Sequence, residues 1–283
     1  MRRSKITCYL LLLPSYLCLG LLFLLPLGAL ALFSFAERDT YGGVRHVYSF
    51  ANYLRAFEPL YFAIYARSVA LALLTTVLCL AVGYPVAYWL GQKVRPEKRN
   101  VLLALVILPF WTSLLIRMYA WIFLLQTEGM INGLLQQMGL IRAPLHLLYN
   151  FPAVLLGQVY GELPFMILAL YASIEKLDPS LVEAAQDLGA GRLKTLLKIT
   201  LPLTRPGIVA GSVLVFIPSL GAFLAPDLLG GARTMTAGSL VQSQFAFVRD
   251  IPFGAAVSWL LTIPVLAVLL LARGGSLQLG QAR

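Results

Sequence analysis

Three charged side chains lie inside or at the edge of long apolar stretches, where charge is expensive. They are Arg117, Glu162 and Asp227. An ionised group in hydrocarbon must face protein or a water-filled cavity. These residues therefore pair with one another, cap broken helices or reach the membrane interface. Alternatively, they line a path that holds cations, which makes Glu162 and Asp227 candidate path residues.

Aromatic residues lie close to these charges in the sequence: Trp111, Tyr119, Tyr160 and Phe165. Aromatic faces attract cations and cover methylene chains. Trp111 and Tyr160 therefore join Glu162 and Asp227 in the candidate substrate path. For each ring, core packing or a place in a membrane-interface belt is the alternative role.

The patterns that support catalysis or cofactor binding are absent. The sequence has no GxxxxGK[ST] phosphate loop, no Gly-Lys pair and no LSGGQ-type signature. We therefore expect no ATP hydrolysis by this chain and no catalytic residue. Cys8, Cys18 and Cys79 lie in apolar runs without CxxC spacing, and the only histidines are His46 and His146. We expect neither a disulfide nor a bound metal or cofactor.

The composition points to a lipid environment. The chain of 283 residues is 59% hydrophobic and only 12% charged, against about 25% charged residues in an ordinary soluble domain. The net charge of +10 raises the question of nucleic-acid binding. However, the basic residues are spread through short loops and form no dense basic face, so no nucleic-acid partner is expected.

Six apolar segments are long enough to cross a bilayer as helices. They lie at about 6–36, 65–91, 100–125, 151–174, 206–229 and 252–272. The sequence thus predicts an all-α membrane protein with one transmembrane domain over residues 1–283. The first segment is too long for a signal peptide and is interpreted as a retained anchor.

The fifth segment has an irregular sequence. Pro218, Ser219, Gly221 and Pro226 interrupt it, and broken helices at membrane depth line cavities or pack within protein. We therefore place this segment on the pathway. Gly207 and Gly211 form a GxxxG pair at its start, which predicts close helix packing.

The distribution of basic residues predicts the orientation. With a cytoplasmic N-terminus, the inner segments carry 14 of the 22 basic residues, as the positive-inside rule requires. Six spans then place both termini in the cytoplasm. On the outer side, Ile131, Leu134, Leu135 and Met138 form the apolar stripe of a short helix that ends near Gly139. This helix either lies on the membrane surface or helps to receive an external partner.

The loop over residues 175–205 is the most informative segment. Asp178 is a good N-cap, and Pro179 suits the first helical position. An apolar stripe of Leu181, Ala184, Ala185 and Leu188 follows, and Gly189 ends this helix. A second short helix is expected up to Leu201-Pro202. The pair either lies on the inner leaflet or forms a knob that fits a cleft in a partner protein.

The same loop resembles the EAA motif of ABC importer permeases. The motif has the form EAA, three residues, Gly, nine residues and I-x-LP, and every fixed position is filled. The resemblance implies a cytoplasmic coupling helix that docks on an ATPase subunit. The coupling residues are then Glu183, Ala184, Ala185, Asp187, Gly189, Ile199, Leu201 and Pro202.

Segments along nearly the whole chain resemble PotB-type permeases of spermidine/putrescine transporters. They include Asn52-Tyr53, Gly83-Tyr84-Pro85, Pro109–Thr112, Leu163–Met166, Ser173–Asp178, Asp227–Gly231 and Arg249–Ala256. The resemblance implies the type I (MetI-like) ABC importer fold in a bacterial inner membrane. It also implies a homologous second permease, two ATPase subunits that carry ATP and magnesium, an external solute-binding protein and a small cationic solute.

Two alternatives stay open at this point. The same machine could carry another small solute, such as an opine, an amino acid or a related amine. The chain could also act alone as a secondary transporter, although the coupling loop and the absence of a visible inverted repeat argue against this.

Overall fold

The computed structural model describes residues 12–14, 16–39 and 42–280. The chain forms two compact units. The first combines residues up to Ala63 with Leu240–Thr262, and the second combines Ile64–Ser239 with residues from Ile263 onward. The predicted start of the first span, Cys8, the basic residues Arg2, Arg3 and Lys5, and Arg283 lie outside the described residues.

The first unit contains an apolar helical segment, a β-hairpin and a short helix. A π-helical turn η1 (Gly20–Leu24) leads into α2 (Leu25–Ser34). Strands β1 (Ala36–Arg38) and β2 (Val44–Tyr48) pair antiparallel, with Ala36 opposite Tyr48, and α3 spans Ala51–Ala56. The hairpin is a feature that the all-α prediction did not contain.

Two polar residues of α3 hold the end of the apolar segment. The Asn52 side-chain amide donates to the carbonyl oxygens of Ser34 and Ala36 at 3.1 and 2.7 Å. The Ser34 hydroxyl lies 2.8 Å from the Tyr53 hydroxyl. The Asn52 amide thus satisfies a carbonyl that α2 leaves unpaired at its C-terminus and one at the start of β1.

A charged pair organises the other end of this unit. Arg55 forms an ion pair of 2.9 Å with the buried carboxylate of Asp250, and its guanidinium lies 4.1 Å from the centre of the Phe253 ring. Asp250 also accepts a bond from the Phe253 amide at 3.2 Å and so caps α14 (Ile251–Gly280). A π-helical turn η6 (Gln244–Val248) precedes this cap.

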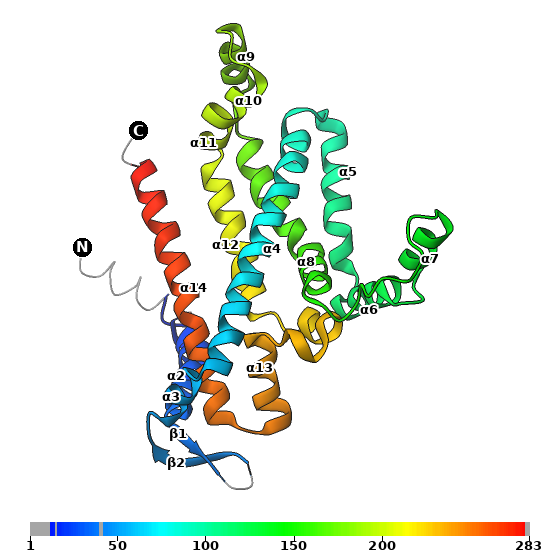
Figure 1. Ribbon diagram of the computed structural model, residues 1–283. Helices are drawn as coiled ribbons and strands as arrows, with labels where there is room; N and C mark the ends of the chain where they lie inside the picture. The colour runs from blue at the N-terminus through cyan, green and yellow to red at the C-terminus, as the bar shows by residue number, and fades with distance from the viewer. Residues whose placement is uncertain (1–11, 15, 40–41, 281–283) are drawn as a thin grey trace, which may run out of the picture. The chain divides into compact units, whose positions relative to one another are not determined.

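The second unit is a set of helices around the long helix α8 (Figure 1). In chain order they are α4 (Pro59–Gln92), α5 (Pro96–Ile107), η2 (Leu108–Trp111), α6 (Leu114–Leu125), α7 (Met130–Gln137), α8 (Phe151–Ile174), α9 (Pro179–Asp187), α10 (Arg192–Thr195), η3 (Leu196–Thr200), α11 (Leu201–Leu203), α12 (Arg205–Gly221), η4 (Pro226–Gly230), η5 (Gly231–Thr234) and α13 (Ala237–Ser243). Helices α4, α13 and α14 each have residues in both units.

Helices α8 and α12 pack closely because small residues line their interface. A β-carbon at Gly207 would meet Ser173 and would lie 3.1 Å from the Ala169 carbonyl oxygen. One at Gly211 would lie 2.7 Å from the Met166 sulfur. The GxxxG prediction of close packing is therefore confirmed.

Five helices in the described part of the chain are long and apolar enough to cross a membrane. The number rises to six if the helices Arg192–Leu203 and Arg205–Gly221, which meet at a bend of 70°, are counted as one span. The expected span at 100–125 is not one continuous helix, because α5 passes into the 3-10 turn η2 and the chain is extended at Thr112 and Ser113. Pro109 has no amide hydrogen for a helix interior, which favours this break.

The fifth span is also shorter than the apolar run. Helix α12 ends at Gly221, and the chain turns through extended Ala222 before the π-helical turn η4. The expected irregularity of residues 218–226 is confirmed, although Pro218 itself lies inside α12.

Candidate functional site

Helix α9 has a defined beginning. The Asp178 carboxylate accepts a bond of 2.9 Å from the Ser180 amide, and Pro179 occupies the first turn. The hydrogen bond from the Ser180 backbone lowers the pKa of Asp178 below its ordinary value. The ionised cap is therefore intact at neutral pH and is lost only as the pH falls through that lowered pKa.

Helix α9 ends in a Schellman turn at Gly189. The Gly189 backbone has φ +81°. The Gly189 amide donates to Gln186 at 2.9 Å, and the Ala190 amide donates to Ala185 at 3.0 Å. The predicted helix stop at Gly189 is confirmed.

Most of the EAA motif faces away from the rest of its unit. Ala185 is the one buried member of the predicted stripe, whereas Leu188 is 89% exposed and Leu181 and Ala184 are exposed. Glu183 and Asp187 are exposed as well. In Figure 1, α9 and α10 project beyond the ends of α8 and α12. An exposed apolar and acidic face at the tip of a rigid unit suits docking to a partner protein.

The segment after Gly189 stays helical for longer than expected. It runs through α10, the π-helical turn η3 and α11 to Leu203, and the backbone stays helical at Thr200 and Leu201, where η3 passes into α11. Ile199 and Leu201 are half-buried and Pro202 is exposed, and Leu201 packs against the core between α4 and α8.

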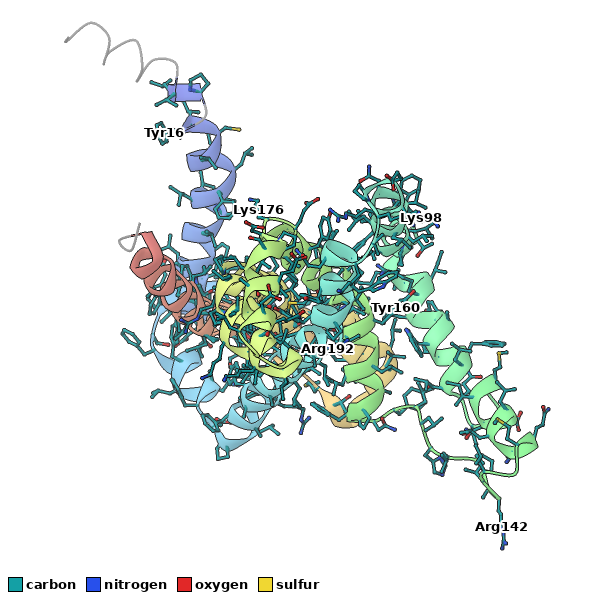
Figure 2. The ribbon with its side chains drawn as sticks, turned by 90° about the horizontal axis from the view of Figure 1, so that it is seen from above. Tyr16, Lys98, Arg142, Tyr160, Lys176 and Arg192 are labelled. Atoms are coloured by element: carbon teal, nitrogen blue, oxygen red, sulfur yellow. The ribbon has the colours of Figure 1, made fainter. Side chains whose placement is uncertain are left out.

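A polar joint ties the base of the coupling loop to two other helices. Gln92 at the end of α4 donates to the carbonyl oxygens of Ile174 and Leu177 at 2.9 and 3.3 Å. Glu175 accepts a bond of 2.6 Å from Tyr171 and lies 3.4 Å from the Arg99 guanidinium. Figure 2 looks onto this end of the unit, where Lys98, Lys176 and Arg192 are labelled. Sequence reasoning missed Gln92, Arg99 and Tyr171, although Arg99 and Glu175 are opposite charges at the ends of neighbouring apolar runs.

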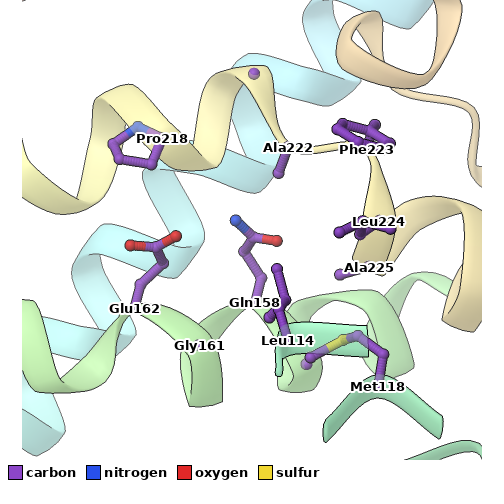
Figure 3. A pocket seen from close by; sticks show the side chains of 12 residues that line it. Leu114, Met118, Gln158, Gly161, Glu162, Pro218, Ala222, Phe223, Leu224 and Ala225 are labelled. Atoms are coloured by element: carbon purple, nitrogen blue, oxygen red, sulfur yellow. The ribbon is translucent and has the colours of Figure 1, made fainter. Parts of the chain in front are cut away.

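A cavity of about 230 Å³ lies among α6, α8 and the end of α12. Glu162 and the almost fully buried Gln158 reach into it from α8, facing Pro218 and Ala222 (Figure 3). The other lining residues are apolar or glycine: Leu114, Met118, Gly157, Gly161, Gly221, Phe223, Leu224 and Ala225. The cavity thus has an apolar wall with two polar groups of α8, as small-molecule sites commonly have.

Glu162 and Arg117 carry hydrogen-bonding atoms with no partner. Glu162 Oε2 is buried without a hydrogen bond, and so are Arg117 Nε and Nη1. The two side chains nevertheless interact electrostatically. Because no direct bond joins them, Glu162 can accept and Arg117 can donate a hydrogen bond to another polar partner.

The Arg117 side chain lies near one ring of each of two aromatic pairs. Phe110 and Phe165 meet edge to face at 4.7 Å between ring centres, and Trp121 and Tyr160 do so at 5.7 Å. The guanidinium lies 5.7 Å from the centre of the Phe110 ring and 6.0 Å from that of Tyr160. We call these four rings the aromatic cluster.

The four residues of the predicted substrate path are not gathered at one place. Glu162 lines the cavity, and Tyr160 belongs to the aromatic cluster. Trp111 is 89% exposed at the end of η2, and Asp227 is exposed in η4, so neither lines the cavity. Sequence reasoning missed Gln158, whose only signal was a polar residue one helical turn before Glu162.

This fold and the EAA motif on α9 are those of a permease subunit of ABC importers. Residues 83–275 match the family described as "Binding-protein-dependent transport system inner membrane component", and the chain belongs to that family. The match includes the whole EAA motif.

Two relatives share nearly half of their aligned residues with this chain. It is 46% identical over 239 residues to the spermidine/putrescine transport system permease protein PotB of Salmonella typhimurium, covering 84% of this chain and 82% of the relative. It is 46% identical over 241 residues to PotB of Escherichia coli, covering 84% and 86%.

Solved structures support the fold. The bacterial alginate ABC transporter in complex with an alginate pentasaccharide-bound periplasmic protein matches with a TM-score of 0.79 at 19% identity, covering 98% of this chain and 96% of that chain. The MetNI methionine ABC transporter matches with a TM-score of 0.53 at 16% identity, covering 76% and 95%. The expected importer fold is confirmed.

Proposed function

We propose that this chain is a permease subunit that imports a polyamine such as spermidine or putrescine across the bacterial inner membrane. A homologous second permease completes the path. Two ATPase subunits bind ATP with magnesium and supply the energy, and an external solute-binding protein delivers the solute. The observation that carries the proposal is the exposed EAA helix α9 on a chain 46% identical to PotB permeases.

The contacts of α9 support its role as the docking element. Its caps fix both ends, and the polar joint of Gln92, Arg99, Tyr171 and Glu175 connects its base to α4 and α8. A rigid, exposed helix on a braced base can transmit a push from a partner protein. Within α9, the exposed motif residues are Glu183, Ala184 and Asp187, and we assign these to the ATPase contact.

The cavity supports a cationic solute. Glu162 offers a buried carboxylate oxygen that lacks a hydrogen bond, and an ammonium group is the natural partner of such an atom. Tyr160, Trp111 and Asp227 do not line the cavity, so they would meet the solute only beyond it. Binding must stay weak, because a carrier that holds its solute tightly cannot release it.

Uptake into proteoliposomes that contain the complete transporter tests this function. Glu162→Gln keeps the side-chain shape and removes the charge, so the KM for spermidine should rise about tenfold, the equivalent of about 1.4 kcal/mol for one charge-assisted bond. Complex assembly and basal ATPase activity should stay near wild type. Glu128→Gln, an exposed carboxylate in the turn before α7, is the matched control. A complex that fails to assemble, with normal transport in what remains, would instead make Glu162 structural.

We place both termini in the cytoplasm, on the basis of the basic residues in the predicted inner segments. Reporter fusions at Arg283 and in the loop after α7 should then report opposite sides of the membrane. Arg142 lies near the tip of that loop, away from Tyr160 on α8 (Figure 2), so a fusion there should not disturb the helices. The same side for both reporters would refute the orientation.

A further inference from the structure

We propose that Arg117 is a built-in competitor of the transported cation, occupying the aromatic cluster and compensating Glu162 until a solute ammonium group displaces it. The inference rests on the proposed function, since it requires a cationic solute. It assigns a specificity-determining role to a residue that is itself positively charged.

The first argument is the setting of the guanidinium. It lies within cation–π distance of Phe110 and Tyr160, one ring from each edge-to-face pair. A quaternary or primary ammonium binds aromatic faces by the same attraction. The aromatic cluster is thus a cation site whose present occupant belongs to the protein.

The second argument is the unmet hydrogen bonding. Arg117 Nε and Nη1 have no hydrogen-bond partner, and neither has Glu162 Oε2. Burying polar atoms in this way is costly. A guanidinium that were only structural would pair with the nearby carboxylate, as Arg55 does with Asp250 at 2.9 Å elsewhere in this chain. Because both groups stay unpaired, an incoming ammonium group can supply the hydrogen bond that the Glu162 carboxylate lacks.

The third argument is the position of Glu162. Its carboxylate lines the cavity and also interacts electrostatically with Arg117. Leu114 and Met118, on the same helix as Arg117, line the cavity wall as well. A solute amine in the cavity can therefore bond to Glu162 directly, while Arg117 moves away from the carboxylate and the rings.

A competing side chain of the protein weakens solute binding even though the contacts of the site with the solute are strong. The solute can bind only while Arg117 is away from the site, so its apparent affinity is reduced by the fraction of time that Arg117 occupies it. When the guanidinium returns, it helps to expel the solute. An empty cavity also keeps its carboxylate electrostatically compensated.

The test is uptake kinetics in proteoliposomes with the complete transporter and its solute-binding protein. Arg117→Gln should lower the KM for spermidine by about threefold to tenfold and should also lower the maximal rate, because release slows. Arg117→Lys retains a competing cation that aromatic faces also attract, so its KM should lie closer to wild type than that of Arg117→Gln. Arg142→Gln, an exposed arginine outside the cavity, should change neither value.

A second variant guards against a folding defect. Arg117→Met keeps the aliphatic stem and should reproduce the lower KM. If Arg117→Gln raises the KM or leaves it unchanged in assembled complexes, the competitor role is overturned. If neither the Gln nor the Met variant assembles, Arg117 is structural and the inference is equally overturned. A wild-type complex that imports neither spermidine nor putrescine would overturn the proposed function and this inference together.

Discussion

Gly189→Pro should abolish transport while leaving the chain in the membrane. Proline is confined to φ near −65°, whereas Gly189 requires φ +81°. The substitution also removes the amide that donates to Gln186 at 2.9 Å. The Schellman turn that ends α9 then cannot form, and α9 loses its fixed direction on the base of the loop.

The measurement is ATPase activity and solute uptake on the same reconstituted complexes. We expect uptake to fall by at least tenfold while the ATPase subunits still hydrolyse ATP. Gly189→Asn is the matched control, since asparagine tolerates the left-handed conformation, and it should retain most of the uptake. Glu183→Arg reverses an exposed charge on α9 without changing a helix cap and should also uncouple. Normal uptake in both Gly189→Pro and Glu183→Arg would show that α9 does not transmit the energy.

Gly207→Leu should prevent α8 and α12 from packing. A β-carbon there would already meet Ser173 and would lie 3.1 Å from the backbone oxygen of Ala169, and a backbone atom cannot rotate aside. Overpacking of a well-packed interface costs about 1–3 kcal/mol, and a whole leucine side chain at this point should reach the upper end of that range. The amount of assembled complex and its midpoint of thermal unfolding in detergent should both fall.

Gly133→Leu is the matched control for this substitution. Gly133 also lies within a helix, α7, but a β-carbon there meets nothing within 4 Å. This variant should assemble and unfold like the wild type. Equal stability of the Gly207 and Gly133 variants would mean that the α8–α12 approach is not as close as described.

The coupling segment could be predicted from sequence because its ends depend on local backbone chemistry. Asp178 caps the nearest amide, and Gly189 permits a conformation that other residues resist. The apolar runs likewise predicted most of the helices, since lipid permits few other structures. The breaks at Pro109–Ser113 and after Gly221 were harder to locate. A proline indicates that a helix bends nearby, but it does not indicate at which residue the helix ends.

The lining of the cavity could be predicted only in part. A carboxylate in an apolar run indicates an energetic cost of burial, and this directed attention to Glu162, which lines the cavity. It does not indicate the direction of the side chain, so Trp111 and Asp227 could not be separated from residues that line the cavity. The aromatic cluster around Arg117 joins rings from η2, α6 and α8, and no spacing within one segment shows such a grouping.

The polar joint at the start of the loop over residues 175–205 connects movement of this loop to movement of α8. Because Glu175 and Ile174 are bonded to residues of α4 and α5, a displacement of the base of this loop is carried by whole helices and not absorbed in the short linker before α9. Glu162 lies thirteen residues along α8 from Glu175, which is about 20 Å at 1.5 Å per residue. A tilt of about 5° at the base then moves the Glu162 backbone by about 2 Å, enough to break a hydrogen bond of ordinary length. Under the proposed function, the distance between the joint and the cavity determines how small a rotation of α9 would separate Glu162 from a bound amine.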